Sequence, residues 1–241
     1  MSRAETHYKQ LLARHYTWLY GGLEPNVERA VNLFAEAGLI PGDDDLAVDL
    51  GCGSGFQSLA LARLGYRVLA IDSSEDLLRE LRNESGKLRI QTIHDDLLHF
   101  ERHLDASPSL IVCMGDTLPH LDGLEAMQLL MQDVHSCLAP KGRFVLSFRD
   151  LGMELKGDDR IIPLKSDDNT LFTCFLEYED DYVTVNDLVY ERKSEVWDFH
   201  RSSYRKVRLS SVHIRDILPK TGFEIVSSKI EDGLVTVIAG K

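Results

Sequence analysis

The sequence predicts an α/β fold with a doubly wound, seven-stranded, mostly parallel sheet and an antiparallel β insertion after the fifth strand. Between residues 46 and 150, short apolar runs alternate with apolar side chains at helix spacing. From residue 151 to 209 strand-like segments follow one another directly, and after residue 210 a helix and two strands return. Strands that alternate with helices pair in parallel through right-handed crossovers, so helices are expected on both faces of the sheet.

The N-terminal region, residues 1–45, is predicted to form a helical lid. Apolar side chains recur at helix spacing there, and Gly21-Gly22 divides the region into two helices. Tyr16, Trp18 and Tyr20 precede these glycines. Glycines beside a helix end provide a hinge, so we expect Tyr20 to contact the substrate, whereas Trp18 is expected to pack on the sheet.

The segments between residues 46 and 150 supply five strands and the helices that connect them. The predicted strands are 46–50, 67–71, 88–93, 110–114 and 143–148. The predicted helices are 56–64, 74–83, 97–104 and 124–138. Ser74 is a good N-cap for the second of these helices, and Pro140-Lys141-Gly142 ends the last.

The insertion, residues 151–209, is predicted to contain antiparallel strands at 171–178, 182–190 and 193–209 and to roof a substrate pocket. Trp197 and His200 are its expected substrate contacts, and the cations of residues 201–208 are expected to form a solvated face. Residues 210–221 are a predicted helix. The last two strands, 223–228 and 234–239, meet at Glu231-Asp232-Gly233, a hairpin signal. Residues 46–150 and 210–241 thus form one domain.

Composition excludes several classes of function. A formal net charge of −12 weighs against a nucleic-acid partner, because phosphate binding draws on clusters of Lys and Arg. No apolar run approaches the roughly 20 residues that cross a bilayer, and the N-terminus lacks the features of a secretory signal. The cysteines have no metal-ligand spacing, which predicts reduced thiols, a cytoplasmic location and no metal site: Cys52, Cys113, Cys137 and Cys174.

A glycine-rich turn lies between the first predicted strand and the first predicted helix of this domain, in the segment 47–55, AVDLGCGSG. Such a turn lets the backbone approach a nucleotide-like ligand. The dinucleotide fingerprint G-x-G-x-x-G would place a further glycine at position 56 or 58, where the chain has Phe56 and Ser58. Asp49 is unfavourable beside a pyrophosphate and suits a ligand that carries an ammonium group.

The segment DLGCGSG resembles the first motif of the class I S-adenosylmethionine-dependent methyltransferases, a Rossmann-like family, and the resemblance extends over most of residues 45–150. It implies that this turn cradles the methionine moiety of the donor. It also implies that an acid at the end of the second strand binds the ribose hydroxyls, and Asp72 occupies that position. A carboxylate can accept from two vicinal hydroxyls, although Asp72 would also serve as a helix cap before Ser73-Ser74.

After the third and fourth strands the resemblance to the family rests on less distinctive residues. Asp96 and Leu97 would meet the adenine, with Asp95 as the alternative, unless these acids merely cap the helix. The loop from Met114 is similar to that of the glycine and sarcosine N-methyltransferase branch. The predicted cofactor-binding residues are therefore Asp49, Gly51, Cys52, Gly53, Gly55, Asp72, Ser73, Asp96, Leu97, Met114 and Gly115.

Methyl transfer from a sulfonium is an in-line displacement that depends on alignment, so catalytic residues are few. His120 is the candidate base or substrate contact, or it packs on the next helix. Asp116 is expected to bind a substrate cation or the methionine end of the donor. Arg149 is expected to hold a substrate carboxylate, or to pair with Asp150.

The sequence therefore predicts an S-adenosylmethionine-dependent methyltransferase that acts on a nitrogen or oxygen of a small molecule, with a homodimer as its assembly. One alternative is a protein that binds the donor or S-adenosylhomocysteine without catalysis. Another is an NAD-dependent oxidoreductase, which Phe56 and Asp49 disfavour. Methylation of nucleic acid fits the acidic composition poorly.

Overall fold

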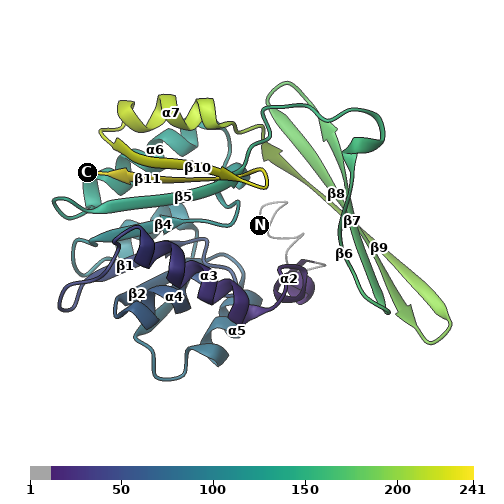
Figure 1. Ribbon diagram of the computed structural model, residues 1–241, viewed down its shortest axis with the longest axis horizontal. Helices are drawn as coiled ribbons and strands as arrows, with labels where there is room; N and C mark the ends of the chain where they lie inside the picture. Colours follow the sequence, from purple (N-terminus) through teal and green to yellow (C-terminus); the bar gives the residue numbers. More distant parts are fainter. Residues whose placement is uncertain (1–11) are drawn as a thin grey trace.

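The structure is a computed structural model that describes residues 12–241, so the beginning of the predicted lid, residues 1–11, lies outside the described residues. Two sheets lie side by side, and the smaller extends away from the α/β body as a strongly twisted ribbon (Figure 1). The seven-stranded sheet has the order β10 (Glu224–Glu231), β11 (Leu234–Gly240), β5 (Arg143–Arg149), β4 (Leu110–Cys113), β1 (Leu46–Leu50), β2 (Arg67–Asp72), β3 (Ile90–His94).

The pairing of these strands confirms the doubly wound prediction. Strands β3, β2, β1, β4 and β5 are parallel, whereas β11 is antiparallel to both β5 and β10. The predicted hairpin at residues 231–233 joins β10 to β11, and Asp232 and Gly233 adopt the positive φ values (49° and 75°) of a tight turn.

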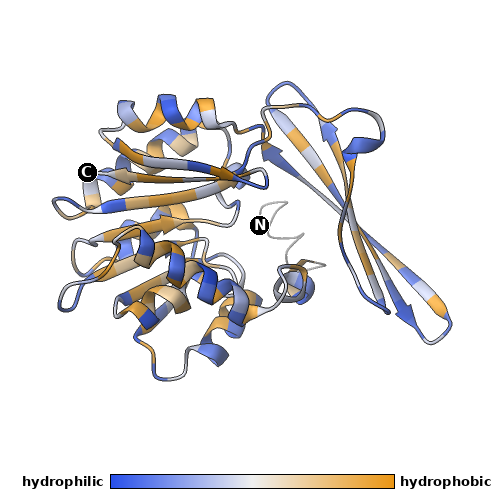
Figure 2. Cartoon of the chain, in the orientation of Figure 1, coloured by the Kyte–Doolittle hydropathy of each residue, from blue (hydrophilic) through white to orange (hydrophobic). Residues whose placement is uncertain are grey.

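Helices cover both faces of the sheet because side chains alternate along each strand. The helices are α3 (Leu23–Glu36), α4 (Phe56–Leu64), α5 (Glu75–Ser85), α6 (Leu124–Cys137) and α7 (Ser211–Lys220). In β1, Val48 and Leu50 join the core formed with α6 and α7, whereas Ala47 faces the core formed with α3, α4 and α5. Figure 2 accordingly shows mainly hydrophobic colours along these strands and mixed colours on the helices.

Short helical turns occupy several connections: η2 (Ala13–His15), α2 (Tyr16–Leu19), η3 (Leu97–His103), η4 (Leu118–His120) and η5 (Gly157–Arg160). The segment predicted as a helix at 97–104 is thus a 3-10 helix, whose first turn is tightened by a hydrogen bond from Leu98 N–H to the Asp96 carboxylate, 2.9 Å. Within residues 12–241, no helix combines the length and the apolarity that crossing a membrane requires.

The second sheet has four antiparallel strands, in the order β6 (Ile161–Ser166), β7 (Thr170–Tyr178), β8 (Tyr182–Lys193), β9 (Val196–Val207). The prediction of three strands here was wrong because β6 contains Pro163, which cannot donate to a ladder. The structure tolerates it in an edge strand, where the register shifts between Pro163 and Lys165. The predicted strand 193–209 was too long, since Ser194 and Glu195 form the turn between β8 and β9.

Candidate functional site

The glycine-rich turn lies where β1 ends and α4 begins, at the carboxyl edge of the sheet. The N–H groups of Gly51 and Cys52 both donate to the Ile71 carbonyl, at 2.9 and 3.0 Å. Gly51, Gly53 and Gly55 have φ values of 72°, 54° and 91°. Residues with a side chain rarely adopt these values, so the tight reversal requires glycine here.

The three glycines are surrounded differently. A Cβ atom on Gly51 would lie 2.4 Å from Thr117 Cγ2, and one on Gly55 would lie 2.3 Å from Leu81 Cδ1, so both positions are closed by protein packing. A Cβ atom on Gly53 would lie 3.4 Å from the Tyr16 hydroxyl. Gly53 is therefore the glycine of the turn that faces the N-terminal segment.

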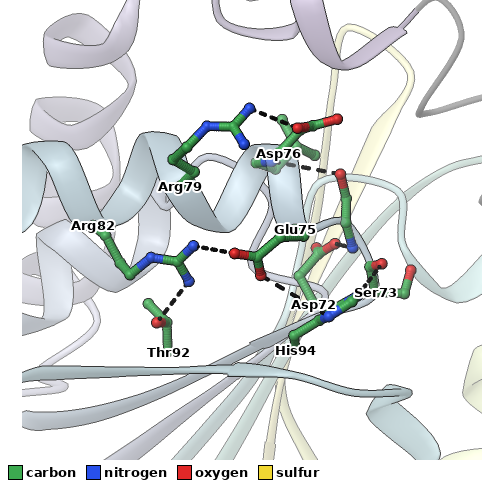
Figure 3. Close-up of polar contacts among 10 residues, drawn as sticks. Asp72, Ser73, Glu75, Asp76, Arg79, Arg82, Thr92 and His94 are labelled. Atoms are coloured by element: carbon green, nitrogen blue, oxygen red, sulfur yellow. Dashed lines mark hydrogen bonds and ion pairs between the residues drawn. The ribbon is translucent and has the colours of Figure 1, made fainter.

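Asp72 ends β2 and is held by the main chain. Its carboxylate accepts from the N–H groups of Gly53 (2.8 Å) and Ser74 (2.7 Å), and burial raises its pKa. The neighbouring acids differ, because Glu75 pairs with an arginine and Asp76 pairs with Arg79 at 2.6 Å (Figure 3). Asp72 thus ties the glycine turn to the start of α5.

Ser74, rather than Asp72, is the N-cap of α5, since its hydroxyl accepts from the Leu77 N–H. The predicted contact Ser73 lies between these two residues, and its carbonyl bonds to His94 Nε2 at 3.0 Å (Figure 3). The ring of His94 thereby links β3 to the end of β2.

Asp49 is fully buried beneath the turn, where one carboxylate oxygen accepts from the Ser58 hydroxyl at 2.6 Å. Burial raises its pKa to about 7, and the hydrogen bond from Ser58 opposes that shift. Burial also raises the pKa of the Cys52 thiol, so Cys52 stays neutral beside it.

We expect Asp49→Asn to stabilise the ligand-free protein at pH 8. Because the folded pKa of about 7 exceeds the usual 3.8, the folded chain binds the proton more tightly than the unfolded chain. The contribution of Asp49 to the free energy of unfolding is fully present below pH 4 and is lost as the pH rises through 7. Asparagine avoids that loss of about 1–3 kcal/mol, so the melting temperature should rise at pH 8 by about 2–12 °C, and by less at pH 5.

The exposed Asp43→Asn is the matched control for this measurement, and it should leave the melting temperature unchanged at both pH values. The assignment of Asp49 would be contradicted if the change in melting temperature, variant minus wild type, were smaller at pH 8 than at pH 5.

The two acids after β3 have distinct partners. Asp95 bonds to His103 Nε2 (2.8 Å) and His99 Nδ1 (3.2 Å), and these hydrogen bonds hold its pKa well below the usual range. Asp96 caps η3, and the adjacent Leu97 packs against the hydrophobic core. Asp95 is thus engaged by the histidines, and the cap expected of these acids is made by Asp96.

The loop after β4 bends sharply at two residues with positive φ, Gly115 (74°) and Asp116 (75°). Gly115 N–H donates to the Ser147 hydroxyl at 2.9 Å, and the Thr117 hydroxyl donates to the Met114 carbonyl at 2.9 Å. These bonds fasten the loop to β5 and to itself, and they place the Asp116 carboxylate at the carboxyl edge of the sheet.

Asp116 forms a nearly buried ion pair with Lys206 of β9. The Lys206 Nζ lies 2.5 Å from one carboxylate oxygen, and the other oxygen accepts from the Arg149 N–H at 3.0 Å. Burial lowers and the Asp116 carboxylate raises the pKa of Lys206, with a net upward shift. Sequence reasoning missed Lys206, and the prediction of a solvated cationic face at 201–208 was wrong for this residue, which is 13% exposed.

Strand alternation was a usable signal for Lys206. His200, Tyr204 and Lys206 lie on one face of β9, whereas the odd-numbered Arg201 and Arg205 face solvent. Tyr204 stacks on His120, with ring centroids 5.4 Å apart. The insertion therefore brings an aromatic ring and a cation to the loop after β4.

The N-terminal segment connects the glycine turn to the second sheet, and α2 lies between the two (Figure 1). The Tyr16 ring stacks on Phe56 of α4 (5.8 Å) and lies 4.9 Å from Tyr20, while the Thr17 hydroxyl donates to Glu80 of α5 at 3.0 Å. Tyr20 is within range of the charges of Lys206 and Asp116. Tyr16, which was not among the predicted contacts, is thus the aromatic nearest Gly53.

On its other side the segment is anchored to β8. Leu12 packs with Phe172 and Val189 in a small apolar cluster. The Glu191 carboxylate contacts the side chains of Arg14 (3.3 Å), His15 (3.4 Å) and His200 (3.0 Å). Burial lowers the pKa of His15. His200, predicted as a substrate contact, is therefore part of this anchor.

Two other predicted substrate contacts lie elsewhere. Trp197 is the second residue of β9, opposite Arg192 near the hairpin turn, and is 47% exposed. The Arg149 side chain reaches the Asp232 carbonyl at 3.3 Å, while Asp150 accepts main-chain N–H groups of Gly152 and Ser211. In the described part of the chain, no three His, Cys, Asp or Glu side chains gather as metal ligands would.

Comparisons with known proteins find similarity to methyltransferases. Residues 47–142 match the family described as "Methyltransferase domain". Over 110 residues the chain is 28% identical to the glycine/sarcosine N-methyltransferase of Aphanothece halophytica, a match that covers 45% of this chain and 42% of that relative. The similarity to the curated relatives therefore spans less than half of their length.

Solved structures are similar over nearly the whole chain. The CcbJ methyltransferase of Streptomyces caelestis superposes with a TM-score of 0.80 at 19% identity, covering 98% of both chains. CalS10 of Micromonospora echinaspora, an amino pentose methyltransferase with S-adenosylmethionine bound, has a TM-score of 0.71 at 14% identity, covering 100% of this chain and 97% of CalS10. At these identities the structures establish the fold. Residues 47–142 therefore match a methyltransferase domain, and the chain as a whole has the fold of the solved methyltransferases.

Proposed function

We propose that the chain transfers a methyl group from S-adenosylmethionine to a nitrogen or oxygen atom of a small molecule. The observation that carries this proposal is the position of Asp72, which joins the second strand to the glycine turn through Gly53. The donor supplies an electrophilic methyl group on a sulfonium. The relatives named above act on glycine, sarcosine and an amino pentose, according to their names, which supports a small acceptor.

The residues of the turn suit this donor. Ser54 is buried, and its hydroxyl finds no hydrogen-bond partner among residues 12–241, so a polar group is available within the turn. Gly53 and Gly115 both face the Tyr16 hydroxyl, and a Cβ atom on either would lie 3.4 or 3.8 Å from it. Because glycine has no side chain, the Tyr16 ring lies over these main-chain atoms. Asp72, Ser73, Asp96 and Leu97 line the edge beside them.

The acceptor is assigned to the side chains with which the loop after β4 and the inner face of β9 meet. The Asp116 carboxylate, which pairs with the Lys206 ammonium there, is the group we assign to an acceptor amine. His120 lies in the same group, stacked on Tyr204, and is the residue we assign to take up a proton from the acceptor. Tyr16 covers the turn at Gly53, and alignment of the acceptor is the main contribution of the chain.

The test is to incubate the protein with S-adenosylmethionine and a panel of amino acids, amino sugars and hydroxylated small molecules, and to measure S-adenosylhomocysteine. Turnover on at least one acceptor is expected. Absence of donor binding by calorimetry at millimolar concentration would refute the proposal. A thermal shift with S-adenosylhomocysteine but no turnover on any acceptor would identify a non-catalytic binding protein instead, and a shift with NAD alone would identify an oxidoreductase.

The N-terminal segment is proposed to be a lid, and its anchor at Glu191 offers a test. Glu191→Gln removes the charge that receives Arg14, His15 and His200. The dissociation rate of S-adenosylhomocysteine should rise by about three- to tenfold, since partly exposed ion pairs contribute about 1 kcal/mol. Stopped-flow fluorescence measures it. The exposed Glu195→Gln should leave the rate unchanged, and an unchanged rate in Glu191→Gln would contradict a lid anchored at β8.

A further inference from the structure

The β8–β9 hairpin carries an apolar surface that no described part of the chain covers. It projects away from the α/β body, and hydrophobic colour reaches its tip (Figures 1 and 2). Trp197, Phe199 and Tyr190 are 47%, 52% and 37% exposed. The Phe199 and Tyr190 rings lie 4.8 Å apart on the outer face of the sheet. Side chains of this size gathered on one surface are typical of an interface.

The two edges of the small sheet differ in a way that points to strand pairing. At one edge, β6 is short, contains Pro163 and has a shifted register, which are features that block the addition of a strand. At the other edge, β9 pairs with β8 over 12 residues without a register shift. Its C-terminal end approaches η4, as the stacking of Tyr204 on His120 shows. Among residues 12–241, the part of this edge that no strand or helix covers is therefore the N-terminal half of β9.

The hairpin geometry indicates which backbone groups are open. Ser194 and Glu195 form a two-residue turn, so the pair Lys193–Val196 exchanges the first hydrogen bonds between β8 and β9. Because bonding alternates along an antiparallel pair, the even-numbered residues of β9 bond to β8. The N–H and C=O groups of Trp197, Phe199 and Arg201 point to the open edge.

We propose that this edge pairs with β9 of a second copy of the chain, antiparallel and about a twofold axis at Phe199. The faces of the two sheets join correctly only if odd-numbered residues of one copy lie opposite odd-numbered residues of the other. The twofold axis must therefore pass through a single residue of β9. With Phe199 on the axis, Asp198 faces His200 of the second copy, and Trp197 faces Arg201 of the second copy. An arginine thus lies beside an indole twice in one interface. Asp198 and His200 keep their partners Lys193 and Glu191 within each copy.

The neighbouring registers lack this complementarity. An axis at His200 would place the two His200 rings opposite each other and Asp198 opposite Ser202. With the axis at Phe199, the two exposed Phe199 rings also lie opposite each other. The two four-stranded sheets then form one continuous eight-stranded sheet. The dimer would cover the open edge of β9. A long edge strand that stays open can pair with any other chain and cause aggregation.

Oligomeric state and register are tested together. Sedimentation equilibrium of the full chain at micromolar concentration should give the mass of two 27.3 kDa chains. Phe199→Lys should weaken association at least tenfold. The matched control is Ile230→Lys, which alters a residue 61% exposed on β10, the edge strand of the large sheet, and should leave the dimer intact. Unchanged thermal melting of both variants would show that neither is misfolded.

Cysteine cross-linking distinguishes the register. Opposed hydrogen-bonded residues have Cα atoms about 5.5 Å apart, within disulfide range, so Phe199→Cys should yield a covalent dimer under mild oxidation. The two copies of Arg201→Cys would lie four residues out of register, about 13 Å apart, and should not cross-link. The wild type, with its own four free cysteines, is the background.

A dimer that cross-links through Arg201→Cys but not Phe199→Cys would overturn the register. A dimer that dissociates with Ile230→Lys and survives Phe199→Lys would overturn the surface. A monomeric wild type would overturn the proposal altogether, and it would leave the edge to residues 1–11 of the same chain or to another protein.

Discussion

Asp72→Asn is expected to raise the dissociation constant for S-adenosylhomocysteine by about 100-fold. The carboxylate lies at the end of β2, where the resemblance to the methyltransferases implies that it would accept charge-assisted hydrogen bonds from the two ribose hydroxyls of the donor. Each such bond contributes about 1.5–3 kcal/mol, and a factor of ten in affinity corresponds to about 1.4 kcal/mol. Isothermal titration calorimetry below the melting temperature measures the effect.

Asp72 also accepts from Gly53 N–H and Ser74 N–H, and the amide of asparagine would face one of these donors. A modest loss of melting temperature is therefore expected as well. Asp76→Asn is the matched control, because Asp76 lies four residues along the chain, is partly exposed and pairs only with Arg79 in the described structure. If Asp72→Asn binds S-adenosylhomocysteine as tightly as this control, Asp72 has no role beyond the turn.

Asp116→Asn is expected to reduce kcat/KM for the acceptor by about 100-fold or more while leaving donor affinity within about threefold. The variant removes the charge that we assign to the acceptor amine, and a group used only for the acceptor should not alter binding of the donor. It also leaves the nearly buried ammonium of Lys206 unpaired, which should cost about 3–5 kcal/mol of stability. Steady-state kinetics and thermal melting measure the two effects.

The double variant Asp116→Asn/Lys206→Met separates catalysis from stability. Removing both charges eliminates the unpaired ammonium, so the melting temperature should recover most of the loss. Activity should not recover, because the acceptor still lacks its carboxylate partner. If activity returns together with stability, the pair is structural and the acceptor binds elsewhere.

The strand–turn–helix around Gly53 could be predicted because its determinants are close in sequence. Residues 46–64 contain the strand, the glycines and the start of the helix, and local steric rules dictate which backbone conformations they adopt. The same holds for the hairpin at residues 231–233. The strand β6 escaped prediction because Pro163 argues against a strand unless the strand lies at an edge, and only the sheet reveals an edge.

The candidate acceptor site depends on contacts between distant segments. Asp116 and Lys206 are 90 residues apart, and neither has a local pattern that identifies the other. Alternation along β9 separates His200, Tyr204 and Lys206 from Trp197, but it leaves open which end of the strand lies over the loop after β4. Packing of Tyr204 against His120 decided this, and it placed Trp197 at the far end.

By itself, the sequence determined the doubly wound sheet, the glycine turn and the acid at the end of β2, since each follows from backbone geometry over a few consecutive residues. The tertiary structure decided that Tyr16 lies over Gly53, that Lys206 pairs with Asp116, and that β9 is an edge strand of the second sheet. The physical reason is that these features arise where separate elements bury surface against one another, and burial is set by the whole fold.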